Sequence, residues 1–341
     1  MFGRKNIGID LGTTSIRILV DKKGVVINDK SVMAVDKNTN RVLKLGREAS
    51  AMIGRAPQDV EIIRPLQGGV VKSYDPTSYM MQQYIKQACG GVVFNPRVMI
   101  CTPSNISDVE QKAVESSAYN AGAREIYLIE EPLAAAFGAG IKVDSDKCKL
   151  IVDIGGGTTD IAIVVNGQVI VSDSVKVAGD RFNQEIMNYV RIKHNLVIGE
   201  KTAEEIKKSI GWVVNHKDPL TYIAKGRSTT TGLPAAAKIT SLEMMDALKA
   251  SLLYLKGRIV GVIEKASAEI KDDLFASRDY GLVLTGGGSL LRGLPEYMHA
   301  MTNIKTWRPD NPELCVILGT GVALENIDRF KDDAKKNKIH M

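Results

Sequence analysis

The sequence has little cysteine and lacks long apolar runs. Its four cysteines (Cys89, Cys101, Cys148 and Cys315) are scattered, without a Cys-x-x-Cys pair, so neither a disulfide framework nor a zinc site is expected. No stretch of about twenty apolar residues occurs without charge, which argues against a membrane-spanning helix. The N-terminal residues MFGRKN lead directly into a strand pattern, without the apolar segment of a secretory signal. We therefore expect a cytoplasmic protein with reduced thiols.

The composition is that of a soluble globular protein with more than one domain. Hydrophobic residues make up 44% and charged residues 25% of 341 residues, and chains of this length usually form two domains. The net charge is +6, and part of this surplus lies in the C-terminal RFKDDAKKNK. Lys335 and Lys336 there are candidates for contact with an anionic membrane surface, and a solvated tail is the alternative. No nucleic-acid partner is expected.

One pattern occurs twice in the chain. NIGIDLGTTSIRILV, residues 6–20, and KLIVDIGGGTTDIAIVV, residues 149–165, each have an apolar strand, an Asp, a Gly/Thr turn and a second apolar strand. The repeat predicts two domains of common design. Helical patterns alternate with short strands in the rest of the chain, which indicates an α/β fold.

Three local predictions concern the second half. TAEEIKKSIGWVV, residues 202–214, predicts a helix with Thr202 as its N-cap and Glu205 closing a capping box. KGRSTTTGLPAAA, residues 225–237, is interpreted as a polar connector. YGLVLTGGGSLLRG, residues 280–293, predicts a strand followed by a helix that opens at its glycines.

Three glycine-rich turns after strands together indicate a nucleotide. Backbone amides and hydroxyls in such turns can donate hydrogen bonds to phosphates. A single turn of this kind is more often an ordinary turn, but two from a repeated unit can hold phosphates from opposite sides. The candidates are Gly12, Thr13, Thr14 and Ser15 in the first turn, Gly155, Gly156, Gly157 and Thr158 in the second, and Gly286, Gly287, Gly288 and Ser289 in the third.

Two carboxylates are expected beside the phosphates. Asp10 and Asp153 end the strands before the first two turns, where their charge would repel a phosphate unless a cation lies between them. Mg²⁺ suits this place, and because it gives up water reluctantly, we expect it to be held through its hydration shell. A turn-capping role is the alternative for either Asp.

The motifs carry a family resemblance over nearly the whole chain. GIDLGTTS, DIGGGTTD, LIEEPLAAA and LTGGGSLL resemble the phosphate, connecting and adenosine motifs of the actin, Hsp70 and sugar-kinase superfamily. RPLQGGVV, GAREIYLIEEPLAAAFGAG, LVIGEKTAEEIKKSIG, TGLP and LTGGGSLLRGLPEY more narrowly resemble the bacterial actin homologue MreB. GTTS and GGVVKSY depart from that family's usual GTAN and DGVIADF, as expected of a divergent paralogue.

The resemblance implies the actin-like ATPase fold, with two duplicated, ribonuclease H-like lobes that each carry a smaller subdomain. The first lobe would comprise residues 1–30, 75–145 and 315–341, with its small subdomain at 31–74. The second would comprise 146–177 and 241–314, with its small subdomain at 178–240. ATP or ADP with Mg²⁺ would bind between the lobes, with Glu204, Glu205, Lys207 and Lys208 approaching the ribose or base. An ordinary charged helix face is the alternative for these four residues.

The resemblance also implies slow ATP hydrolysis. Glu131 would orient the attacking water, with Thr158 as a second contact. The residues themselves leave Glu130 and Glu131 equally placed, and a strand or helix cap is the alternative for either.

Head-to-tail polymerisation into membrane-associated filaments follows from the same resemblance, with protofilaments that pair. Val93 and Phe94 would contact the membrane from a loop, or fold back on their own domain. Membrane-anchored shape or wall-synthesis proteins would be the partners, and the cellular role would be cell shape, or motility in a wall-less cell. A chaperone-like protein or a small-molecule kinase of the same fold is the alternative.

Overall fold

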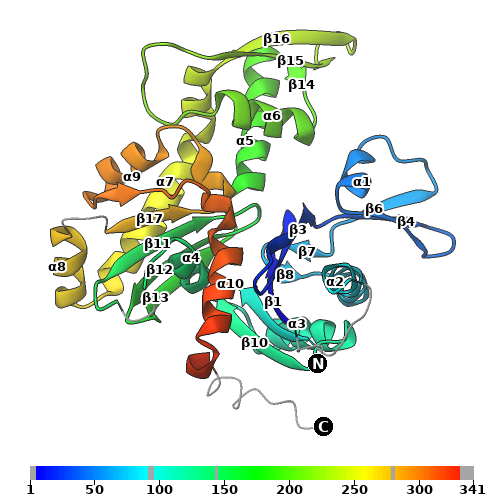
Figure 1. The fold of residues 1–341 in the computed structure, drawn as a ribbon. Coiled ribbons are helices and arrows are strands. Elements are labelled where there is room, and N and C mark those ends of the chain that lie inside the picture. The colour runs from blue at the N-terminus through cyan, green and yellow to red at the C-terminus, as the bar shows by residue number, and fades with distance from the viewer. Residues whose placement is uncertain (1–4, 91–95, 143–144, 278–280, 331–341) are drawn as a thin grey trace.

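The computed structural model describes residues 5–90, 96–142, 145–277 and 281–330 and has two lobes (Figure 1). The first large sheet has five strands in the order β10-β9-β1-β2-β3. Its strands are β1 (Asn6–Leu11), β2 (Ser15–Val20), β3 (Gly24–Lys30), β9 (Arg97–Thr102) and β10 (Glu125–Glu130). β1, β2 and β3 are antiparallel, whereas β9 and β10 run parallel to β1.

The second large sheet repeats this arrangement, in the order β13-β12-β11-β17-β18. Its strands are β11 (Lys149–Ile154), β12 (Thr159–Val165), β13 (Gln168–Val175), β17 (Leu282–Thr285) and β18 (Thr306–Trp307). Three antiparallel strands are again followed by two parallel ones. The repeat in the sequence therefore corresponds to a duplicated sheet.

Each large sheet is covered on both faces, which explains its almost continuous apolar strands. In β9, Val98 and Ile100 pack with α2 (Tyr74–Ala88) and α3 (Asp108–Asn120), whereas Met99 and Cys101 pack on the opposite side. In the second lobe, α5 (Gly179–His194), α7 (Ser241–Lys265) and α9 (Leu294–Thr302) cover one face. α8 (Ala268–Ala276) lies at the edge of this lobe.

Two helices lie between the lobes. α4 (Glu131–Gly138) and α10 (Cys315–Glu325) share one hydrophobic cluster with residues from both large sheets, among them Met99, Ile151 and Val283. Their backbones approach closely at glycines, since a Cβ on Gly319 would overlap the carbonyl oxygen of Ala134. A Cβ on Gly138 would likewise overlap the carbonyl oxygen of Cys315. This helix pair joins the two halves of the molecule.

Each lobe carries smaller elements. Those of the first lobe are β4 (Met33–Asp36), β5 (Val42–Leu45), α1 (Gly46–Ala51), β6 (Val60–Ile63), β7 (Leu66–Gln67) and β8 (Val70–Val71). Those of the second are β14 (Leu196–Val197), α6 (Glu200–Ile210), β15 (Thr221–Ser228) and β16 (Pro234–Thr240). Single 3-10 turns are η1 (Gly287–Leu290), η2 (Pro312–Leu314) and η3 (Ile327–Phe330). The exact domain limits given above remain a prediction.

The three local predictions for the second half need correction. α6 begins at Glu200, after Gly199 as N-cap without a side-chain cap, so Thr202 lies inside the helix. The helix ends at Ile210, and Trp212 instead bridges to Arg292. The supposed connector is largely β15 and β16, which pair as a hairpin. The glycines after β17 open only the 3-10 turn η1, and α9 starts later.

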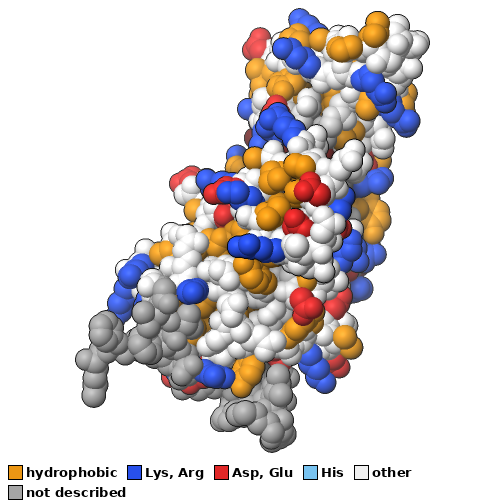
Figure 2. All heavy atoms as spheres, turned by 90° about the vertical axis from the view of Figure 1, so that its right-hand side faces the viewer, with side chains coloured by type: hydrophobic (Ala, Val, Ile, Leu, Met, Phe, Trp, Pro, Cys, Tyr) orange, Lys and Arg blue, Asp and Glu red, His pale blue; other side chains and the backbone are white. Residues whose placement is uncertain are grey.

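The described surface shows neither a membrane-spanning helix nor, on the face drawn in Figure 2, a patch of one charge. Within the described ranges, no helix combines the length and apolar character that crossing a bilayer requires. Figure 2 shows the face on the right of Figure 1, where acidic, basic and hydrophobic side chains are interspersed.

The α4–α10 contact generates a stability prediction. Gly319→Ala should destabilise the protein by about 1–3 kcal/mol, because the new methyl group would overlap the backbone of α4. Gly321→Ala in the same helix is the matched control: its Cβ would meet Leu19 at 3.4 Å, an ordinary contact. The control should gain up to about 1 kcal/mol from helix propensity. Urea unfolding of both variants measures this, and equal stability would contradict the role of Gly319.

Candidate functional site

A cavity of about 500 Å³ lies between the two lobes. Residues of the first lobe line it from the β1–β2 turn, and residues of the second lobe line it from the β11–β12 turn, α5, α6 and η1. Most predicted site residues meet here: Asp10, Gly12, Thr13, Thr14, Ser15, Glu131, Asp153, Gly155, Gly156, Gly157, Thr158, Glu204, Lys207, Lys208, Gly286, Gly287 and Gly288.

The first two glycine turns are equivalent and touch each other. Each is closed by a backbone hydrogen bond, from Gly12 N to Ser15 O (3.1 Å) and from Gly155 N to Thr158 O (2.9 Å). A Cβ on Gly156 would overlap Thr14 of the other lobe. Thr14 Oγ1 is buried and has no hydrogen-bond partner among the described residues. The turns therefore leave polar atoms available at the meeting point of the lobes.

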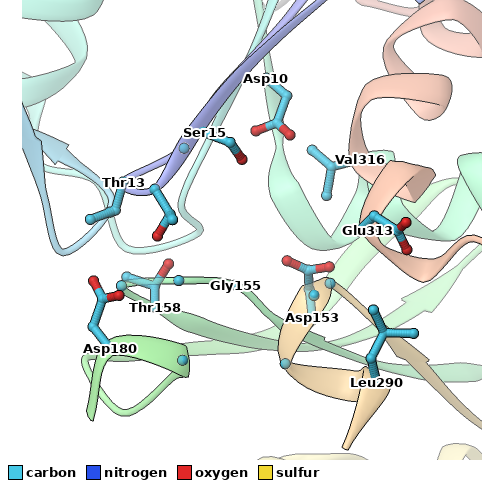
Figure 3. A pocket seen from close by; sticks show the side chains of 18 of the residues that line it. Asp10, Thr13, Ser15, Asp153, Gly155, Thr158, Asp180, Leu290, Glu313 and Val316 are labelled. Carbon is cyan, nitrogen blue, oxygen red and sulfur yellow. The ribbon is translucent and has the colours of Figure 1, made fainter. Parts of the chain in front are cut away.

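Asp10 and Asp153 approach this point from opposite lobes (Figure 3). Both are buried, and Asp10 Oδ2 accepts a 2.7 Å hydrogen bond from Arg17 Nη1. Burial, with the charges of Asp160 and Asp10 adding to it, raises the pKa of Asp153 to about 7, although Thr285 partly offsets this. Asp153 Oδ1 has no hydrogen-bond partner within the described part of the chain. A buried, unpaired carboxylate oxygen is a suitable place for a cation.

Glu131 begins α4 and lines the cavity, whereas its neighbour Glu130 does not. Glu131 is buried, and Asp160 of β12 is the neighbouring carboxyl group that most affects its ionisation. Burial first, and then the charge of Asp160, raises the pKa of Glu131 well above its usual value. Asp160 is buried as well, and burial raises its pKa to about 6. A raised pKa makes the carboxylate form of Glu131 a stronger base towards water.

Helix α6 presents one side to the cavity. The carboxylate of Glu204 forms ion pairs with the Nζ atoms of Lys207 (2.7 Å) and Lys208 (2.9 Å). Burial alone would raise the pKa of Glu204, but the two lysines and Asn183 outweigh it and hold the value at about 2. Glu205 lies outside the cavity lining, and its carboxylate accepts a hydrogen bond from Tyr222 (2.9 Å).

The third glycine turn packs against the second. Gly286 has φ of 78°, and a Cβ there would overlap the backbone of Ile154. Ser289 is buried and donates a hydrogen bond to Gly286 O (2.7 Å), so it does not line the cavity. Leu290 and Leu291 do, and they supply an apolar wall next to the glycines.

Several lining residues were not predicted from the sequence: Arg17, Lys30, Gly69, Gly179, Asp180, Leu290, Leu291, Glu313 and Val316. Arg17 had a visible signal, because it is the one charged residue in the apolar strand SIRILV. Gly179 and Asp180 begin α5, where their N–H groups donate to the carbonyl oxygens of Gly155 and Gly156. These residues meet the second glycine turn only because the chain comes back to it after β12 and β13, so no pattern in the nearby sequence predicts the contact.

The membrane candidates Val93, Phe94, Lys335 and Lys336 lie outside the described residues. Among the residues described, no group of three or more His, Cys, Asp or Glu side chains could hold a metal ion by itself.

Two duplicated lobes around a cavity with opposed glycine turns define an actin-like fold. The family model described as MreB/Mbl protein matches residues 4–332, and the chain belongs to this family of actin-like proteins.

Among relatives, cell shape-determining protein Mbl of Bacillus cereus is 42% identical over 97% of this chain and 98% of its own length. Cell shape-determining protein MreB of Escherichia coli K12 is 38% identical over 96% and 95%. The crystal structure of MreB5 of Spiroplasma citri bound to ADP has a TM-score of 0.91 at 32% identity, covering 97% of this chain and 99% of that one. The MamK double helical filament, at 20% identity and a TM-score of 0.79 over 95% and 99%, shares the fold.

The buried Asp153 generates a pH prediction for the nucleotide-free protein. A carboxyl whose folded pKa is raised stabilises the fold fully below its unfolded pKa of about 4, and this contribution is lost as the pH rises through about 7. Asp153→Asn should therefore raise the melting temperature by a few degrees more at pH 8 than at pH 5. Asp146→Asn, an exposed change before the same strand, should show no such difference. Equal shifts for Asp153→Asn at both pH values would contradict the prediction.

Proposed function

We propose that the chain is an MreB-like ATPase that binds ATP or ADP with Mg²⁺ in the interlobe cavity. It hydrolyses ATP slowly and polymerises into cytoskeletal filaments in the cytoplasm, at the inner face of the cell membrane, that control cell shape. The observation that carries nucleotide binding is the pair of glycine turns, which face each other from duplicated lobes with Thr14 Oγ1 unpaired. The Spiroplasma citri MreB5 structures with ADP and with AMPPNP support this ligand class.

Asp10 and Asp153 suit a Mg²⁺ ion that is held through its hydration shell, as expected from the sequence. Asp153 Oδ1 is buried and unpaired, and Asp10 approaches from the other lobe. Two carboxylates without a third ligand suit an ion that keeps most of its waters and shares the phosphate oxygens. When bound, Mg²⁺ would neutralise charge on the phosphates during hydrolysis. Asp10 and Asp153 would hold its water molecules by hydrogen bonds.

The arrangement also suits water activation. Glu131 would accept a proton from the attacking water, with Thr158 lining the same cavity as a second contact. Such a site positions reactants but offers few further groups for the transition state, so hydrolysis should be slow.

Replacing Glu131 separates catalysis from binding. Glu131→Gln should lower the rate of phosphate release by roughly 100-fold, because the amide cannot accept a proton, and should leave ADP affinity nearly unchanged. Glu130→Gln is the matched control: this neighbour lies outside the cavity lining, and its rate should stay near that of the unaltered protein. A phosphate-release assay with ADP titration measures both. Equal loss of binding and rate would show that Glu131 is structural.

Filament formation and membrane contact rest on family membership. The MamK double helical filament shows that this fold can polymerise, and the cell shape-determining relatives support a role in shape. A heterologous, head-to-tail contact between subunits generates an open filament rather than a closed ring. The nucleotide state of one subunit could then affect its neighbour. Pairing of the protofilaments, membrane-anchored partners and contact through Val93, Phe94, Lys335 and Lys336 are parts of the same proposal. A chaperone-like or small-molecule kinase protein is the alternative.

Sedimentation tests the assembly proposal. With ATP and Mg²⁺ the protein should pellet above a critical concentration, and vesicles with anionic lipid should increase the pelleted fraction. Deletion after Phe330 should reduce vesicle binding, since every basic residue near an anionic surface contributes about 1 kcal/mol. Phe94→Ser should also reduce it, because an apolar side chain is lost from the contact. Neutral vesicles are the control. A protein that stays monomeric at high concentration would favour the non-filament alternative, and unchanged binding in both variants would remove the membrane contacts.

A further inference from the structure

Lys30, at the end of β3, is a cavity cation whose side chain has no partner among the described residues. Among the described residues, Arg17, Lys30, Lys207 and Lys208 are the basic residues that line the cavity. Arg17 pairs with Asp10 at 2.7 Å, and Lys207 and Lys208 both pair with Glu204. For Lys30 Nζ, by contrast, there is no hydrogen bond or ion pair with the described part of the chain.

Several carboxylates around Lys30 are occupied by other donors, and Asp180 acts on Lys30 only through its charge. Asp29 Oδ1 accepts from the backbone N–H groups of Lys30 and Arg47, and Asp29 Oδ2 accepts from the hydroxyl of Tyr84. Asp10 and Glu204 are occupied by the ion pairs already described. The ammonium group of Lys30 therefore keeps its three donors for the cavity.

Strand pairing places Lys30 beside the first glycine turn. Ser15 and Lys30 are direct partners in the antiparallel β2–β3 pair, and directly opposed side chains project to the same face of a sheet. Across the cleft, Lys30 interacts electrostatically with Asp180, Glu204 and Lys208 of the second lobe. Lys30 thus lies between the phosphate turn and the part of the cavity where α6 is expected to meet the ribose.

The protein groups of the cavity make an unfavourable environment for this charge. Burial is the main cause that lowers the pKa of Lys30, and Lys208 and Arg17 lower it further, whereas Glu204 and Asp180 partly offset them. A cation that is partly desolvated between other cations gains most from an anionic ligand.

We propose that Lys30 binds the phosphates of the nucleotide nearest the ribose, as a contact from the first lobe opposite Lys207 and Lys208. This inference rests on the proposed nucleotide-binding function. Because these phosphates are present in both ADP and ATP, Lys30 contributes equally to the binding of both. It acts in binding and in bringing the lobes together across the ligand, and it does not take part in the proton transfer at Glu131.

Calorimetric titration with ADP and with AMPPNP, each with Mg²⁺, tests the proposal. Lys30→Met should weaken the binding of both by a similar factor of about 10 to 100, the loss of one charge-assisted hydrogen bond. Lys30→Arg should recover most of the affinity. Lys23→Met, an exposed lysine at the far turn of the same β2–β3 hairpin, should bind like the unaltered protein. The melting temperature of nucleotide-free Lys30→Met should not fall, because a partly buried charge is removed.

Several results would overturn the proposal. Unaltered affinity in Lys30→Met would exclude the contact, and equal losses in Lys30→Met and Lys23→Met would reveal only a long-range charge effect. A loss for AMPPNP but not for ADP would place Lys30 at the terminal phosphate. If the unaltered protein binds neither nucleotide, the proposed function itself is wrong. If it binds both and Lys30→Met has the same affinities, only the role of Lys30 is wrong.

Discussion

The close contact of α4 and α10 is the constraint on which the site depends. Both helices are packed between the two large sheets, and their backbones meet where Gly138 and Gly319 have no side chain. Glu131 begins α4, and Val316 lies in the first turn of α10, so each helix brings a residue to the cavity. A larger separation of the helices would move the lobes apart and with them the two glycine turns.

The cavity combines charges that the fold alone does not favour. Asp153 and Glu131 are buried carboxyl groups with raised pKa values, and Lys30 lies among other cations. Buried charges of this kind cost free energy unless a ligand compensates them. An anionic nucleotide with Mg²⁺ would relieve both conflicts at once.

Prediction from the sequence succeeded where the signal was local and repeated. The Asp-Gly-Thr turns predicted the duplicated sheets and the two opposed turns in the cavity lining. It failed at α6, because the polar residues near Thr202 resemble a cap although the helix already starts at Glu200. It also failed for residues 225–237. Strand β15 exposes Lys225 and Arg227 on one face, and such alternation in a polar segment resembles a loop.

The sequence by itself determined the class of fold and the turns that face the cavity, because strand periodicity and glycine turns act over short distances. Only the tertiary structure decided that Glu131 and Glu204 line the cavity while their neighbours Glu130 and Glu205 do not. It also brought Arg17 and Lys30 there, through the pairing of β1, β2 and β3. The direction of a side chain relative to a distant lobe depends on how sheets and helices pack together, and no local pattern encodes that packing.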